Sequence, residues 1–96
     1  MVAHGQRAGR RTLAGYLLLD QSADAGRVGF IVSRGVGGAV VRNRVRRRLR
    51  ELMRRRTLPA GSLLVLRVLP PAAGLCSAQL DRELDALMRR LSPVGP

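Results

Sequence analysis

Apolar residues in the middle of the chain recur with the spacing of an amphipathic helix. They follow one another at intervals of four, four, three and one residues: Val41, Val45, Leu49, Leu52 and Met53. Positions spaced in this way fall on one helix face and would pack against a core. The Leu-Pro-Ala-Gly sequence at 58–61 ends the pattern, because proline and glycine terminate helices.

A second helical pattern lies near the C-terminus. It begins near Ser77, which we interpret as the N-cap, and stops before Pro93. Asp81, Glu83 and Asp85 come early and Arg89 and Arg90 come late, as the helix dipole favours. Its apolar face consists of Leu80, Leu84, Leu87, Met88 and Leu91.

The remaining apolar runs predict strands. Residues 27–33 and 62–69 each read as a buried strand, and residues 10–19 as one bent strand or two short ones broken at Gly15. Residues 20–26 have turn composition. The order strand, strand, helix, strand, helix predicts an α+β fold, a two-layer sandwich with helices on one face of a small sheet. We expect a single domain spanning residues 1–96.

Composition adds a strong charge to this foldable pattern. The 96 residues hold 18 basic side chains, all of them arginine, against 6 acidic ones, a net charge of +12. Such an excess predicts a polyanionic partner, either nucleic acid or an acidic membrane surface. The single cysteine excludes an internal disulfide. No apolar run approaches the roughly 20 residues that span a bilayer.

Half of the arginines, nine of 18, lie within residues 42–56, where Glu51 is the only acid. On a helix, Asn43, Arg47, Arg50 and Arg54 form a stripe away from the apolar face, flanked by Arg46. A further row holds Arg44, Arg48 and Arg55. Arginine matches phosphate with a planar fork of donors. A membrane-surface helix would carry aromatics at its apolar boundary, and this segment has none, so we favour nucleic acid.

The sequence offers no convincing catalytic or metal-ligating set. His4 and Cys76 have no partner at metal-ligand spacing, and no Ser/His/Asp arrangement can be assembled. We interpret Asp81 and Asp85 as a solvated helix face rather than a Mg²⁺ site. We therefore predict no catalytic residue and no bound metal in this chain.

For two features of the sequence, two interpretations remain open. The glycine-rich loop at 35–38 is either a tight turn or a place where an anion meets the following helix N-terminus, and the two are compatible. Tyr16 is either a half-buried strand residue or a ring accessible to a nucleic-acid base.

One family combines these features. The strand RVGFIVSR at 27–34, the glycine turn, and the string GGAVVRNRVRRRLRE at 37–51 resemble the bacterial ribonuclease P protein component. The family's signature is an Arg-Asn-Arg followed by alternating basic and apolar residues on one helix, here at 42–44 and beyond. The resemblance extends from His4 through the C-terminal helix, nearly the whole chain.

The resemblance implies a function. The family's protein is the small subunit of a cytoplasmic ribonucleoprotein that removes the 5′ leader from precursor tRNA. The RNA subunit is the catalyst, and Mg²⁺ is held mainly by RNA. The implied partners are the catalytic RNA and precursor tRNA, with no membrane and no protein partner. The implied fold is a ribosomal-protein-like mixed sheet with a left-handed βαβ crossover.

Site residues carry over by position. The resemblance implies that the RNA subunit is contacted by Arg42, Asn43, Arg44, Arg46, Arg47 and Arg50. Arg34 stands where the family has a basic residue entering the loop. Ala14 and Tyr16 would line the cleft for the leader.

The chain also departs from the family pattern. The family's first helix, which bears phenylalanines of the leader cleft, is expected to be lacking, and Val2 stands where an aromatic is common. Gly35 replaces a basic loop residue and Arg48 an apolar helix residue. The alternative function is a ribosome-associated or general RNA-binding module without a processing role.

Overall fold

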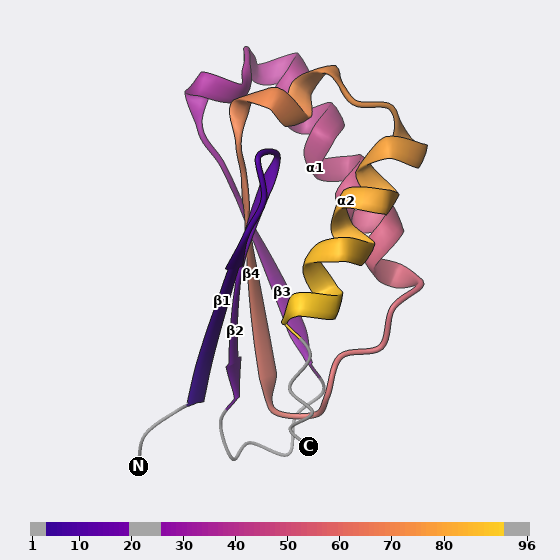
Figure 1. Ribbon diagram of the computed structural model, residues 1–96. Coiled ribbons are helices and arrows are strands. Elements are labelled where there is room, and N and C mark those ends of the chain that lie inside the picture. The colour runs from indigo at the N-terminus through magenta and orange to yellow at the C-terminus, as the bar shows by residue number, and fades with distance from the viewer. Residues whose placement is uncertain (1–3, 20–25, 92–96) are drawn as a thin grey trace.

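Two helices lie on one face of a four-stranded sheet (Figure 1). The computed structural model describes residues 4–19 and 26–91. All of the predicted turn at 20–26 except Gly26, and the position of Val2, therefore lie outside the described residues. The elements in chain order are β1 (His4–Gly9), β2 (Leu13–Leu19), β3 (Arg27–Val32), the 3₁₀ turn η1 (Arg34–Val36), α1 (Ala39–Arg54), β4 (Ser62–Val68), the 3₁₀ turn η2 (Pro70–Gly74) and α2 (Ser77–Arg90).

The sheet is mixed, with strand order β1-β2-β4-β3. β1 pairs with β2 and β2 with β4 in antiparallel fashion, whereas β3 and β4 run parallel and are joined through α1. A parallel pair needs such a crossover, because a short turn cannot return the chain to the same end. The α+β prediction, with a small mixed sheet and both helices on one face, is confirmed.

Side chains alternate between the two faces of the sheet, as the pleat requires. Leu13 and Leu17 of β2 and Leu64 and Leu66 of β4 are buried beneath the helices. The intervening residues face away from the helices, where Leu18, Ile31 and Leu63 are 38–51% exposed. The sheet therefore has one covered face and one open face.

The predicted helix stripes form the other half of the core. Val45, Leu49, Leu52 and Met53 of α1 are buried, and Val41 packs against them at partial burial. Leu80, Leu84 and Leu87 of α2, with Leu91 just beyond it, are at most 1% exposed. The amphipathic periodicity identified these contacts correctly.

The first strand region differs from the prediction. Residues 10–19 are neither a bent strand nor two short strands, because β1 ends at Gly9 and β2 runs unbroken from Leu13 through Gly15. Gly15 is present because α2 comes close to it. A Cβ there would lie 2.6 Å from Leu91 Cδ1 and 3.1 Å from Leu87 Cδ2. A glycine within a strand commonly marks such a close approach.

Gly37 settles part of the question about the glycine-rich loop. Its φ of 154° is rarely adopted by L side chains, and a Cβ would lie 2.9 Å from Val41 Cβ. Glycine is therefore required where η1 turns into α1. This confirms the tight-turn interpretation, while the anion interpretation stays a prediction.

The cap of α2 is one residue earlier than predicted. Cys76, not Ser77, is the N-cap, and it forms a capping box with Gln79. The backbone N–H of Cys76 donates to Gln79 Oε1 at 2.9 Å. The hydrogen bond from the Gln79 backbone lowers the pKa of the Cys76 thiol.

Glu83 fastens the β1–β2 turn to α2. Its carboxylate accepts hydrogen bonds from Arg10 Nε at 2.9 Å, Arg10 Nη2 at 3.2 Å and Thr12 Oγ1 at 2.7 Å. These hydrogen bonds, of which the one from Arg10 has the largest effect, lower the pKa of Glu83 below its usual 4.5. The hydrogen bond between Arg10 and Glu83 also raises the pKa of Arg10.

We expect this contact to make the free energy of unfolding depend on pH in the acid range. Because the pKa of Glu83 is lower in the folded state, its stabilising effect is complete above pH 4.5 and is lost as pH falls through the folded-state value. Glu83→Gln should be less stable than the wild type at pH 7. The two free energies of unfolding, measured by urea titration across pH, should converge in acid. Parallel curves would contradict this role.

Candidate nucleic-acid interface

The outer face of α1 carries a basic hollow of about 540 Å³. Five of the seven residues predicted to bind RNA line it, together with one apolar side chain. The lining residues are Val40, Asn43, Arg44, Arg46, Arg47 and Arg50. Because no carboxylate lines this hollow, four guanidinium groups share it without a counter-charge. We call these six residues the α1 surface.

One polar contact organises the α1 surface. Arg46 Nη1 donates to Asn43 Oδ1 at 3.1 Å, which is the i, i+3 spacing of neighbours on a helix. Asn43, Arg44, Arg47 and Arg50 are exposed, and Arg46 is half-buried. The asparagine thus orients one guanidinium and leaves the others free to meet an anion.

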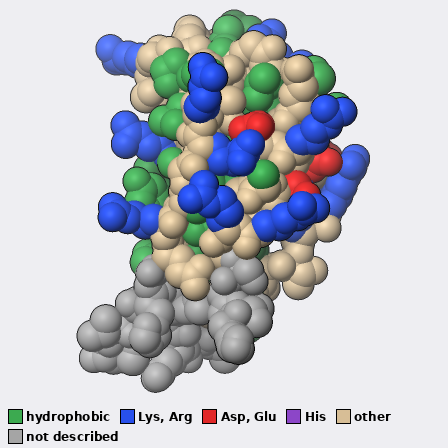
Figure 2. All heavy atoms as spheres, in the orientation of Figure 1, with side chains coloured by type: hydrophobic (Ala, Val, Ile, Leu, Met, Phe, Trp, Pro, Cys, Tyr) green, Lys and Arg blue, Asp and Glu red, His purple; other side chains and the backbone are tan. Residues whose placement is uncertain are grey.

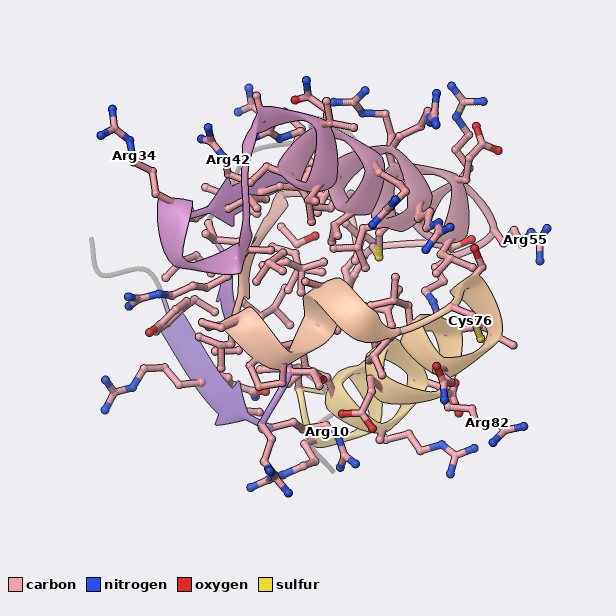
Figure 3. All side chains as sticks on the ribbon, turned by 90° about the horizontal axis from the view of Figure 1, so that it is seen from above. Arg10, Arg34, Arg42, Arg55, Cys76 and Arg82 are labelled. Carbon is pink, nitrogen blue, oxygen red and sulfur yellow. The ribbon has the colours of Figure 1, made fainter. Side chains whose placement is uncertain are left out.

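Arg34 and Arg42 lie apart from this hollow, near the start of α1. Figure 3 shows both side chains pointing outward from the end of the molecule where η1 leads into α1. Arg34 is exposed and Arg42 half-buried. The seven predicted residues therefore form one cluster of five and a pair beside it.

Two other arginines of the 42–56 run, Arg48 and Arg56, hold the fold together. Arg48 Nη1 donates to the Leu75 carbonyl at 3.1 Å, which fastens α1 to the segment before α2. Arg56 Nη2 lies 3.0 Å from Asp81 Oδ1, and its Nη1 lies 3.4 Å from Asp85 Oδ1. Asp81 and Asp85 are about half exposed, as a solvated helix face would be, but both carboxylates also join α2 to the end of α1, which the sequence did not predict.

Val40 is a member of the α1 surface that the sequence analysis missed. It is 78% exposed and stands three residues before Asn43 and four before Arg44, on the same helix face. The sequence does contain a sign of this exposure. Val40 directly precedes Val41, the first residue of the apolar stripe, and does not itself belong to that stripe. An exposed valine among arginines offers an apolar contact for a sugar or base.

Ala14 and Tyr16, the two residues that the resemblance assigned to the leader cleft, lie together on the open sheet face. They line a second hollow, which also includes Arg7, Ala8, Gly9 and Arg90. Tyr16 is half-buried and pairs with Arg7 across β1 and with Val65 across β4. Its two interpretations are therefore compatible, because a half-buried ring here faces the uncovered side.

The rest of the open face is apolar with arginines at its border. Leu18 lies beside Leu63, and Ile31 lies beside Arg67, in the register of the sheet. Arg27 pairs with Leu63 at the far edge and is exposed, as is Arg67. A face of this kind suits single-stranded nucleic acid, whose bases meet apolar surface while phosphates meet arginine.

Charge is distributed unevenly over the molecule. Figure 2 shows basic side chains over much of one face, with acidic side chains confined to the part where α2 lies. Within residues 4–19 and 26–91, no three His, Cys, Asp or Glu side chains are grouped so that they could hold a metal ion. In the same residues, no helix is long and apolar enough to cross a membrane.

Comparison with known proteins decides the family. The model of the ribonuclease P family matches residues 1–92. The chain belongs to the ribonuclease P protein family. This family supplies the protein component of a tRNA-processing ribonucleoprotein endoribonuclease.

Relatives named ribonuclease P protein component match over most of their length. One from Nocardioides is 47% identical over 94 residues, which cover 94% of this chain and 80% of the relative. Another, from Streptomyces avermitilis, is 50% identical over 104 residues, which cover 98% of this chain and 85% of the relative.

Solved ribonuclease P proteins share the fold. The Staphylococcus aureus protein has a TM-score of 0.80 at 23% identity, covering 88% of this chain and 79% of that one. The Thermotoga maritima protein has a TM-score of 0.77 at 21% identity, covering 96% and 86%. At these identities the likeness shows the fold alone.

Proposed function

We propose that this chain binds the catalytic RNA of ribonuclease P through the α1 surface and holds the 5′ leader of precursor tRNA on the open sheet face. The observation that carries the proposal is the gathering of four arginines and Asn43 in one hollow without a carboxylate. The protein would act in the cytoplasm, and the bond-breaking chemistry would belong to the RNA.

The α1 surface suits a folded RNA backbone. Its guanidinium groups project from one helix, so the backbone that carries them needs no further ordering when they meet successive phosphates. Each phosphate that an arginine neutralises releases bound counterions, which gives binding a strong dependence on salt. Arg34 and Arg42 would extend the contact past the start of α1.

The open sheet face suits the leader. Tyr16 provides a ring on which a base can stack, and stacking of this kind contributes about 1–3 kcal/mol per base. Arg7 and Arg90 line the same hollow and are placed to meet the flanking phosphates. Ala14, being small, leaves the space beside the ring open.

Within residues 4–19 and 26–91, the carboxylates of α2 do not fit a Mg²⁺ site. Glu83 is bound to Arg10 and Thr12, and Asp81 and Asp85 are bound to Arg56. A hard cation would have to displace these arginines, so we propose that the Mg²⁺ of the holoenzyme is held by RNA. The arginines would lower the Mg²⁺ requirement, because they replace counterions around the RNA.

The family match favours this function over a general RNA-binding module. It spans residues 1–92, which include both the α1 surface and the open sheet face.

Replacing Tyr16 tests the leader half of the proposal. Tyr16→Ala should weaken holoenzyme binding of precursor tRNA by roughly tenfold, the loss of one stacking contact. It should leave binding of mature tRNA and of the catalytic RNA unchanged. Tyr16→Phe keeps the ring and serves as the matched control, with affinity near the wild type. Equal weakening for precursor and mature tRNA would contradict the assignment, and Kd values from filter binding decide it.

A further inference from the structure

A second set of arginines lies beside β1, one of the two edge strands of the sheet. Arg7 and Arg11 come from β1 and the turn after it, and Arg82 and Arg90 come from α2. The two α2 residues are eight apart, with Ala86 between them, so they lie on one helix face. Arg90 Nη1 donates to the Gly9 carbonyl at 3.0 Å, which places this helix face against the β1 edge. We call these four arginines the β1-edge surface.

The β1-edge surface includes a hollow of about 370 Å³. Its size is within the range of small-molecule sites. It combines arginines, the carboxylate of Glu83 and uncharged polar groups with the apolar side chains of Pro71 and Leu75. The full lining is Arg10, Arg11, Thr12, Pro71, Leu75, Gln79, Arg82 and Glu83. Such a lining suits one nucleotide, with its base on the apolar wall and its phosphate at an arginine.

The charge of this surface is largely uncompensated. Arg10 is neutralised by Glu83 in a two-point contact. Arg7, Arg11, Arg82 and Arg90 form no ion pair with a carboxylate in residues 4–19 and 26–91. A polyanion is the partner that complements four such groups.

Position identifies which RNA would reach this surface. Figure 3 shows Arg10 and Arg82 on the opposite side of the molecule from Arg34 and Arg42, so an RNA segment docked on α1 does not cover them. The β1-edge hollow and the hollow that Tyr16 lines are instead neighbours along the chain, at the end of β1. Gly9 lines the hollow of Tyr16 and Arg10 lines the β1-edge hollow, and these residues are consecutive.

We infer that the β1-edge surface binds leader nucleotides upstream of those held on the open sheet face. A leader that crosses the sheet toward β1 leaves it at Arg7 and Arg90 and meets Arg11 and Arg82 next. The contact is with the phosphate backbone and one base, so it would depend on leader length rather than on sequence. This inference rests on the proposed leader-binding function.

Leader length provides the test. Holoenzyme reconstituted with the catalytic RNA is titrated with precursor tRNAs whose leaders are extended one nucleotide at a time. The variant Arg11→Ala/Arg82→Ala is compared with the wild type. Arg54→Ala/Arg55→Ala is the control, because it removes the same charge from exposed positions at the end of α1.

The expected result is a gain in affinity that begins at a threshold length. The wild type and the control should bind long-leader precursors about tenfold more tightly than short-leader ones, and the Arg11/Arg82 variant should lack this gain. For this variant, the slope of log Kd against log salt should be smaller by about 1.4 than for the wild type, because two single-strand contacts contribute about 0.7 each. This difference should be seen with long leaders only. Affinity for short leaders should be unchanged.

Three outcomes would overturn the inference. They are retention of the gain by the Arg11/Arg82 variant, an equal loss for short and long leaders, and weaker binding of the catalytic RNA alone. A wild-type holoenzyme that binds precursor and mature tRNA equally would instead contradict the proposed function itself. Retention of the gain by the variant would overturn only the upstream contact.

Discussion

Replacing Arg46, Arg47 and Arg50 together with alanine should weaken binding of the catalytic RNA by about two to three orders of magnitude. All three line the α1 surface, and each is expected to contribute about 1 kcal/mol through a phosphate contact, where 1.4 kcal/mol is tenfold. The plot of log K against log salt should become shallower by about 2.7, because each contact with a duplex contributes about 0.9.

A control with the same charge separates this surface from general attraction. Arg54→Ala/Arg55→Ala/Arg89→Ala also removes three positive charges, all from exposed residues outside the α1 surface. It should weaken binding far less. Equal weakening by the two triple variants, measured at several salt concentrations, would show that net charge rather than the α1 surface determines affinity.

Replacing Leu84 with alanine should cost about 2–5 kcal/mol of folding stability. Leu84 is fully buried where α2 packs on the sheet, so its removal leaves a cavity that the surrounding side chains fill only in part. Stability of roughly 0.05–0.15 kcal/mol per residue is typical of a domain, so this single change would remove a large share of it. Urea denaturation monitored by circular dichroism measures the loss.

Leu63→Ala is the matched control. Leu63 is also a leucine, but it belongs to strand β4, lies on the open sheet face and is 38% exposed. Its replacement should cost about 1 kcal/mol, because less apolar area is lost than at Leu84 and no closed cavity forms on the open face. A loss at Leu63 as large as that at Leu84 would contradict the assignment of an open and a covered face.

Much of the fold could be predicted because the helices carry a strong period. The stripe from Val41 to Met53 and the face from Leu80 to Leu91 are buried as expected. β3 and β4 were also found, because their apolar runs are flanked by turn residues. The two-layer arrangement followed from the order of these elements.

β1 was missed because its sequence has no strand pattern. The residues HGQRAG hold one small apolar side chain with a polar or glycine neighbour on each side, and the strand forms through its pairing with β2. Gly15 was mistaken for a break because glycine interrupts most isolated strands. Its true role depends on Leu87 and Leu91, residues more than seventy positions away.

The candidate site, too, could be predicted from the sequence only in part. Helical spacing placed Asn43, Arg46, Arg47 and Arg50 on one face, and the structure gathers them with Arg44 in one hollow. Spacing could not show that Arg48 and Arg56 bind the rest of the fold, since their partners at Leu75, Asp81 and Asp85 come from α2 and the segment before it. The β1-edge surface could not be predicted for the same reason, because its arginines come from two parts of the chain, the β1 region and α2.

Cleavage by the reconstituted ribonucleoprotein tests the central claim most directly. The chain is mixed with its cognate catalytic RNA and a precursor tRNA, at a Mg²⁺ concentration too low for the RNA to act alone. Removal of the leader is followed with and without the protein. If the chain is the protein component of ribonuclease P, cleavage should become many times faster with the protein, and the Arg46/Arg47/Arg50 variant should lose most of that gain. Cleavage no faster with the protein than with RNA alone would contradict the claim.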